Sequence, residues 1–213
     1  MKSKLQILVL AFIAIIGFGI SESNGQNKPK MAENEKIETA KVSYKSVKID
    51  GLDIFYREAG NKNNPTILLL HGFPTSSHMF RNLIPALADK FHLIAPDYPG
   101  FGLSSMPKVN EFNYTFENLT NIVDKFTEAV GAAKYSLYVQ DYGAPIGFRL
   151  AVKHPERVQA LIIQNGNAYE EGLSENAAPL KVYGPNRDPK LTEALRGFLK
   201  VETTKFQYTH GAK

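Results

Sequence analysis

Apolar and polar residues alternate in two short segments that begin the patterned part of the chain. These segments, residues 42–49 and 52–56, flank the dipeptide Asp50-Gly51. Alternation around such a dipeptide predicts a β-hairpin. Longer, mainly apolar runs, typical of strands buried on both faces, follow at residues 66–70, 91–95, 135–140 and 158–163.

Helical patterns separate these apolar runs. One helix is expected from Thr75 or Ser76 to about Lys90, with its apolar face formed by Phe80, Leu83, Ile84 and Leu87. A second helix begins at its N-cap Thr115, and a third ends before Pro155. Strands that alternate with helices predict an α/β fold, in which a doubly wound, mostly parallel sheet is covered by helices on both faces.

Each of three apolar runs ends in a break that is rich in turn residues. The breaks are residues 71–74, residues 97–105 and the turn at Asp141. Because ligands of open α/β sheets bind at the carboxyl ends of the strands, these breaks are expected to meet at one rim. That rim is the predicted functional site.

Asp141 stands between an apolar run and the small residues that begin at Gly143. This pattern is typical of a nucleophile elbow, a strained strand-to-helix turn that pushes one side chain out over the end of a sheet. The alternative is an ordinary solvated turn, where Asp is also favoured. The other breaks at the same rim favour the elbow.

The first twenty-five residues have the pattern of a secretory signal peptide. Lys2 and Lys4 precede an apolar run at residues 7–20, and the small residues at 23–25 suit cleavage. An uncleaved anchor is the alternative, but about fourteen apolar residues fall short of the roughly twenty that a spanning helix needs. We therefore expect an exported protein, periplasmic or secreted, with no stable membrane association after cleavage. Residues 26–40 are expected to form a flexible lead-in.

Charge and cysteine content exclude several classes of function. The net charge of +4 becomes +3 once two lysines and one glutamate of the signal peptide are removed. So weak a bias, without clustered basic residues, gives no reason to expect nucleic-acid binding. The absence of cysteine excludes disulfides and a thiolate nucleophile. The five histidines lack paired carboxylate spacing, so no metal site is predicted, and no cofactor is expected.

Three motifs together resemble one branch of a known superfamily. They are His71-Gly72-Phe73-Pro74-Thr75-Ser76-Ser77, Asp97-Tyr98-Pro99-Gly100-Phe101-Gly102-Leu103-Ser104 and Val139-Gln140-Asp141-Tyr142-Gly143. In this order and spacing they are similar to the haloalkane dehalogenases and epoxide hydrolases of the α/β-hydrolase superfamily. The resemblance covers about residues 45–170. It implies a hydrolase core at 41–168, followed by the start of a helical cap at 169–213, in which one helix is expected from Leu191 to about Thr204.

The resemblance implies a hydrolase that acts on a small molecule, an alkyl halide or an epoxide. Asp141 would be the nucleophile, because an ionised carboxylate attacks carbon without first losing a proton. The backbone N–H groups of Phe73 and Tyr142 would form the oxyanion hole. Gly72 and Gly143 would let the loop and the helix approach the strand closely. His71 is expected to support its loop, and Asp97 to hold a turn.

The chain also departs from the family pattern. It has no Trp, whereas several dehalogenases hold the halide with one, and Asn165 occupies a position where some relatives place the catalytic acid. His210 is the only histidine after the third helix and is a poor candidate for the base. We therefore expect a chain that is incomplete and lacks the catalytic His. The alternative is a non-catalytic or degenerate member of the fold that binds a ligand.

Overall fold

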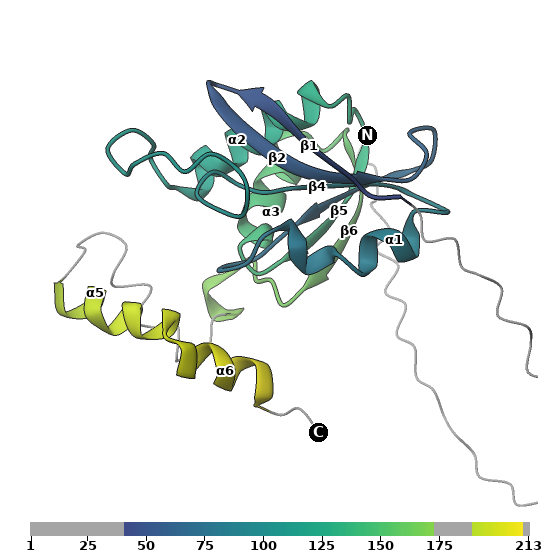
Figure 1. Cartoon of the computed structure of the whole chain (residues 1–213). Helices are drawn as coiled ribbons and strands as arrows, with labels where there is room; N and C mark the ends of the chain where they lie inside the picture. Colours follow the sequence, from purple (N-terminus) through teal and green to yellow (C-terminus); the bar gives the residue numbers. More distant parts are fainter. Residues whose placement is uncertain (1–40, 173–188, 211–213) are drawn as a thin grey trace, which may run out of the picture. The chain divides into compact units, whose positions relative to one another are not determined.

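The computed structural model of the protein describes residues 41–172 and 189–210. Within these residues, six strands form one sheet in the order β1-β2-β4-β3-β5-β6 (Figure 1). Their bounds are β1 Ser43–Ile49, β2 Leu52–Ala59, β3 Thr66–Leu70, β4 His92–Pro96, β5 Tyr135–Gln140 and β6 Val158–Gln164. β1, β2 and β4 pair antiparallel, whereas β4, β3, β5 and β6 run parallel. The predicted doubly wound, mostly parallel α/β sheet is confirmed.

The predicted hairpin is confirmed as β1 and β2. Ile49 pairs with Leu52, so the turn between the strands has two residues. Asp50 and Gly51 both have positive φ, 48° and 84°, as a type I′ turn requires. β2 runs three residues past the predicted Tyr56 and pairs with β4 along that extension.

Helices cover both faces of this sheet (Figure 1). The helices of the described residues are η1 Ser77–Phe80, α1 Leu83–Leu87, α2 Phe116–Ala129, α3 Gly143–Lys153, η2 Glu170–Gly172, α5 Pro189–Arg196, η4 Gly197–Leu199 and α6 Val201–Thr209. α2 and α3 pack on one face, and η1 and α1 pack on the other. Thr115 caps α2 as predicted, because its side chain accepts the Asn118 N–H at 3.1 Å.

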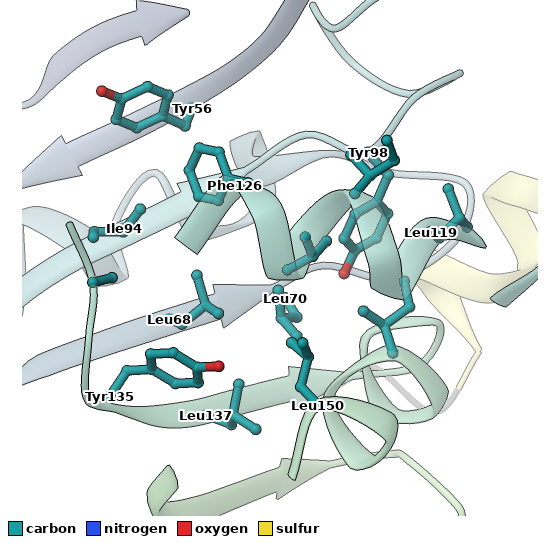
Figure 2. Close-up of a cluster of buried hydrophobic side chains, with 14 of the residues drawn as sticks. Tyr56, Leu68, Leu70, Ile94, Tyr98, Leu119, Phe126, Tyr135, Leu137 and Leu150 are labelled. Atoms are coloured by element: carbon teal, nitrogen blue, oxygen red, sulfur yellow. The ribbon is translucent and has the colours of Figure 1, made fainter. Parts of the chain in front are cut away.

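A dense apolar cluster lies between the sheet and the helices α2 and α3 (Figure 2). Leu68 and Leu70 of β3, Leu137 of β5 and Leu150 of α3 are fully buried in it. Burying each such side chain stabilises the fold by about 1.5 to 3 kcal/mol. The fully buried Tyr98, just beyond β4, belongs to the same cluster. The core therefore extends to the carboxyl ends of the strands and gives the loops there a rigid base.

The helix predicted from 75 or 76 to about 90 is wrong in extent. The chain forms the 3-10 turn η1 and then the short α1, with Arg81 and Asn82 between them. Pro85 lacks an N–H and is tolerated only in the first turn of a helix, so α1 begins just before it. The predicted apolar face is nevertheless right, since Phe80 and Ile84 are buried against the sheet.

The single helix predicted from Leu191 to about Thr204 is also wrong. The chain forms α5, the turn η4 and then α6, which begins after Lys200. Lys200 has extended backbone angles, φ −73° and ψ 149°, which break the helical hydrogen-bond ladder. Gly197, which has low helix propensity, begins the break.

β6 is an edge strand of the described sheet, and most of its residues are exposed. Leu161, Ile162 and Ile163 are among the exposed large apolar side chains. β1 is the other edge, and it carries the charged Lys45 and Lys48. The two edges of the described sheet thus differ in the polarity that they offer to solvent.

The predicted signal peptide at 1–25 and the predicted lead-in at 26–40 both lie outside the described residues. Both, and the export that they imply, stay predictions. In the described ranges, no helix is long and apolar enough to cross a membrane.

Candidate active site

Asp141 lies at the turn between β5 and α3, the place that the sequence predicts for it. Its φ is +49°, a left-handed conformation that is costly for a residue other than glycine. At Gly143 a Cβ atom would stand 2.2 Å from the Leu70 carbonyl oxygen. Only glycine therefore lets α3 begin this close to β3. Such packing holds the turn in its strained form.

The loop after β3 passes directly beside Asp141. A Cβ atom on Gly72 would stand 2.2 Å from Gln140 Oε1 and 2.6 Å from Asp141 Cβ. Because Gly72 has no side chain, the next amide reaches the acid, and the Phe73 N–H donates to Asp141 Oδ1 at 2.7 Å. The sequence predicted that both residues belong to one site, and the fold brings them together across 68 positions of the chain.

Tyr142, the residue after Asp141, stands at the N-cap of α3. Its ring packs against Phe73 at 5.2 Å and Phe116 at 4.9 Å between ring centroids, and Phe101 lies 6.2 Å from Phe73. Burial, reinforced by the Asp141 charge, raises the pKa of the Tyr142 hydroxyl above its ordinary value. The phenol therefore stays protonated at neutral pH. These four rings make the neighbourhood of Asp141 apolar.

His71 is completely buried next to the loop that carries Phe73. Its Nδ1 lies 2.9 Å from the Gly72 carbonyl oxygen, and its Nε2 accepts the Tyr98 N–H at 3.4 Å. Burial lowers the pKa of His71, against the opposing influence of the Gly72 carbonyl and the charges of Asp97 and Asp141. The ring is thus neutral, with both nitrogens engaged, which agrees with the predicted supporting role.

Asp97 is the second acid at this rim, and it is only 1% exposed. Its Oδ1 accepts the Ser77 N–H at 2.7 Å, and its Oδ2 accepts the Leu103 N–H at 2.8 Å. A Cβ atom on Gly102 would stand 1.9 Å from Asp97 Oδ2. Asp97 therefore ties the segment after β3 to the loop after β4, as the predicted turn role requires.

The remaining described histidines are engaged elsewhere. His78 Nδ1 lies 3.4 Å from Arg57 Nη2, and His92 Nε2 lies 2.7 Å from Glu58 Oε1. His154 Nε2 lies 3.0 Å from Asp124 Oδ2, and His210 stacks on a neighbouring ring of α6. Across residues 41–172 and 189–210, no group of three or more His, Asp and Glu side chains could hold a metal ion. A surface recess of about 450 Å³ between α2 and α3 does not include Asp141.

Comparison with known proteins identifies the family. A profile described as alpha/beta hydrolase fold matches residues 65–198. The chain belongs to the α/β-hydrolase fold family.

Relatives of this α/β-hydrolase include dehalogenases. An uncharacterised hydrolase of Saccharomyces cerevisiae is 49% identical over 154 residues, which are 71% of this chain and 52% of that protein. A haloalkane dehalogenase of Bradyrhizobium diazoefficiens is 40% identical over 111 residues, 52% of this chain and 35% of that one. The crystal structure of a haloalkane dehalogenase from Bradyrhizobium elkanii matches with a TM-score of 0.64 and 30% identity, over 73% of this chain and 53% of that one.

The α/β-hydrolase chain spans about half the length of its yeast relative and about a third of the dehalogenase from Bradyrhizobium diazoefficiens. The likeness to a haloalkane dehalogenase branch agrees with the resemblance that the motifs indicate.

Sequence reasoning did not find two rings of this α/β-hydrolase site. Phe101 lies in the turn-rich loop after β4, and Phe116 is the first residue of α2. Neither belongs to an apolar run that points at the rim. The available signal was position alone, since Phe101 lies within the motif from Asp97 to Ser104, and Phe116 directly follows the predicted cap Thr115.

Proposed function

We propose that this α/β-hydrolase acts on alkyl halides or epoxides through an ester formed on Asp141. The observation that carries the proposal is the hydrogen bond from the Phe73 N–H to Asp141 Oδ1 at 2.7 Å. It fixes one carboxylate oxygen against an amide, while the other oxygen has no hydrogen-bond partner in the described part of the chain. That second oxygen is the one available for attack.

In the proposed first step, Asp141 Oδ2 attacks a carbon atom of the substrate. A C–O bond forms, and the bond from carbon to the halogen or to the epoxide oxygen breaks, with its electron pair moving to the leaving atom. With an alkyl halide the products are an alkyl ester of Asp141 and a free halide ion. With an epoxide the only product is an ester whose alkyl group carries the alkoxide, and this alkoxide then needs a proton. The Tyr142 hydroxyl, which burial keeps protonated, is an acid of suitable type beside the nucleophile.

In the proposed second step, water attacks the ester carbonyl carbon and negative charge develops on Oδ1. The Phe73 N–H already points at this oxygen, and the Tyr142 N–H is the proposed second donor. The bond from the carbonyl carbon to the alkyl oxygen then breaks, and an alcohol leaves. This step needs a base to take a proton from water. His71 is not assigned to it, because both its ring nitrogens are engaged.

The surroundings of Asp141 support an apolar substrate. Phe73, Phe101, Phe116 and Tyr142 form a continuous set of ring contacts beside the acid. Aromatic surface favours alkyl and aryl groups over hydrated, charged ones. The dehalogenases among the relatives favour the halide as leaving group over the epoxide oxygen.

The test is covalent labelling of the full chain. The protein is incubated with 1-bromohexane, and separately with styrene oxide, and its intact mass is measured over time with peptide mapping. We expect the mass of one alkyl group to be added at Asp141, or free bromide and alcohol if a base completes the cycle. Bromohexane is expected to react faster than styrene oxide.

Asp141→Asn is the reactivity control, and Asp53→Asn is the matched control for a solvent-exposed acid. Unlabelled wild-type protein that also releases no bromide or diol would contradict the proposal. If 1-bromohexane then bound equally well to the wild-type and the Asp141→Asn protein, the alternative of a non-catalytic binding protein would be favoured.

A further inference from the structure

Arg57 of β2 is an arginine whose charge has no acidic partner among the described residues. Arg149, Arg157 and Arg196 lie 3.7, 3.0 and 2.6 Å from a carboxylate oxygen. In the described ranges, Arg57 and Arg81 form no such pair, and their side chains bond only to neutral groups. These two arginines therefore carry positive charge that no described carboxylate neutralises directly.

The guanidinium of Arg57 is held in place although it lacks an acid. Its Nε donates to Ser77 Oγ at 3.1 Å, and its Nη2 lies 3.4 Å from His78 Nδ1. Its Cζ lies over two rings, 4.9 Å from the centroid of Tyr44 and 5.7 Å from that of Phe55. Such contacts fix the side chain without removing its charge. The two N–H bonds of Nη1 have no acceptor in the described part of the chain.

His78 of η1 contacts both of the unpaired arginines. Arg57 reaches its ring at Nδ1, and Arg81 Nη1 donates to its backbone carbonyl oxygen at 3.3 Å. An arginine N–H can only donate, so His78 Nδ1 accepts and the ring proton lies on Nε2. His78 and Arg81 are exposed, and Arg57 is half-buried. Two guanidinium groups and one imidazole N–H donor thus meet at an accessible surface.

The acids close to Arg57 in the chain or in the fold are engaged elsewhere. Asp97 is closed off from solvent and accepts two backbone N–H groups, one of them from Ser77 at 2.7 Å. Asp53, on the same face of β2 as Arg57, pairs with a lysine of β1 at 3.0 Å. The buried Glu58 lies on the other face and bonds to a histidine of β4 at 2.7 Å. A ligand is therefore needed to complete the surroundings of Arg57.

We propose that Arg57, with Arg81 and His78, binds a phosphate-type oxyanion, either free phosphate or the phosphate group of a monoester. Nη1 and the second N–H of Nη2 of Arg57 form a fork that matches two phosphate oxygens. Two arginines carry two positive charges, and a phosphate monoester near neutral pH carries about −1.5 to −2. The charges balance better than they would with a single carboxylate. The inference goes beyond the proposed function and does not depend on it.

Tyr44 bears on which of the two sources of phosphate the site takes. It lies directly opposite Arg57 in the pairing of β1 with β2, and 63% of it is exposed. Its ring offers apolar surface beside the guanidinium, on which the organic group of a monoester can lie. Phenyl phosphate and inorganic phosphate are therefore the probes that distinguish a monoester from free phosphate.

The first measurement maps the site on the full wild-type chain. ¹H–¹⁵N NMR spectra are recorded while inorganic phosphate is added from about 0.1 to about 20 mM, with chloride holding the ionic strength constant. We expect the amides of Arg57, Ser77 and His78 to shift together and to saturate with one Kd on the order of 1 mM. Shifts that do not saturate, or that leave these three amides unmoved, would overturn the proposal.

The second measurement compares the Kd of phosphate among variants of the unpaired arginines. Arg57→Gln removes the charge and should raise the Kd about 10- to 100-fold. Arg57→Lys keeps the charge but loses the fork, so its Kd should rise by a smaller factor, about 3- to 10-fold. Arg81→Gln should raise the Kd about 3-fold, because this exposed side chain contributes mainly through its charge.

Arg149→Gln is the matched control for these variants. Arg149 also lies over an aromatic ring, 5.9 Å from the Phe116 centroid, but it has Glu117 as an acidic partner. Its loss should change the Kd by less than about 2-fold. An equal rise in Arg149→Gln and Arg57→Gln would show that phosphate responds only to net charge, and the site would be overturned.

Phenyl phosphate then identifies the source of the oxyanion. Binding about 5-fold tighter than that of phosphate, with the gain lost in Tyr44→Leu, assigns a monoester. Equal affinities assign free phosphate. In both cases the Kd must depend on Arg57. If Arg57→Gln does not fold, Arg57→Lys and the wild-type map decide, and a folded Arg57→Lys protein with wild-type affinity for both probes overturns the role given to the guanidinium fork.

Discussion

Asp97 and Asp141 are two acids in matching places with different surroundings. Each follows a parallel strand, β4 or β5, at the same rim of the sheet. Each also accepts a backbone N–H from the segment after β3 at 2.7 Å, Ser77 for Asp97 and Phe73 for Asp141. Residue type, position along the strand and first hydrogen bond therefore do not distinguish them.

The second oxygen of each carboxylate makes the difference. Asp97 Oδ2 accepts the Leu103 N–H at 2.8 Å, and the side chain is closed off from solvent. Asp141 Oδ2 has no such donor within the described residues, and Asp141 is half-buried on a backbone with φ +49°. A carboxylate with both oxygens bound ties two loops together, whereas one with a free oxygen can react.

Asp141→Asn is the strongest test of this comparison, because its expected effect is the largest. An amide is a far weaker nucleophile than a carboxylate, so labelling by 1-bromohexane should fall on the order of 10³-fold or more. The Asn side-chain oxygen can still accept the Phe73 N–H, so the free energy of unfolding should change by less than about 1 kcal/mol. Intact-mass kinetics and urea unfolding measure the two quantities. A large loss of stability with labelling retained would reverse the roles given to the two acids.

Asp97→Asn should instead lower the stability of the fold and leave the labelling of Asp141 in place. One of the two backbone donors, from Ser77 or Leu103, would then face an NH₂ group in a buried site. Leaving a buried donor unsatisfied, and losing charge-assisted hydrogen bonds, should lower the free energy of unfolding by about 2 to 4 kcal/mol. The labelled position should remain Asp141. Urea unfolding at neutral pH, followed by labelling of the folded fraction, checks both statements. An Asp97→Asn protein as stable as wild type would remove the structural role.

Much of this contrast could be predicted from the sequence, because apolar runs and turn-rich breaks follow one another along the chain in a recognisable order. Strands β3 and β5 begin and end as predicted, because mainly apolar runs and the turn residues that follow them are local signals. That Asp97 and Asp141 lie at one rim of the sheet was predicted because both follow the carboxyl ends of strands. The use of the second oxygen of Asp97 could not be predicted, because its donor Leu103 sits in a loop whose path depends on Gly102 and its contacts.

The failures of prediction have local physical causes. The helix expected after residue 75 gives way to η1 and α1, partly because Pro85 restricts where a helix can begin. The expected cap helix divides after Gly197. After residue 75 the apolar spacing is helical, but spacing alone does not register the missing N–H of a proline. The sequence also does not predict that Phe101 and Phe116 lie close to Tyr142, because these contacts form only when the chain folds.

Gly72→Ala tests how closely the loop after β3 must approach Asp141. It does not test the surroundings of Asp97. The added Cβ would meet Asp141 Cβ at 2.6 Å, and that atom is fixed by the elbow, whereas Gln140 Oε1 can move aside. The loop should retreat and lengthen the bond from the Phe73 N–H, slowing ester turnover or labelling about 10- to 100-fold. Gly197→Ala, where nothing lies within 4 Å of the new Cβ, is the matched control. Equal rates for both variants would show that the close approach is unnecessary.

Ser104→Ala tests the outer support of Asp97 and should have the smallest effect. The Ser104 hydroxyl donates to the Asp97 carbonyl at 2.7 Å and accepts the Phe55 N–H at 2.9 Å, both in a buried setting. Its loss should lower the free energy of unfolding by about 1 to 2 kcal/mol. Ser105→Ala removes a similar acceptor for the Asp53 N–H in an exposed setting, where water can replace it, so its cost should stay below about 0.5 kcal/mol. Urea unfolding gives both values, and neither change should alter labelling of Asp141. If Ser104→Ala slowed that labelling, the support around Asp97 would also extend to Asp141, the proposed nucleophile, and the two acids would act as one unit.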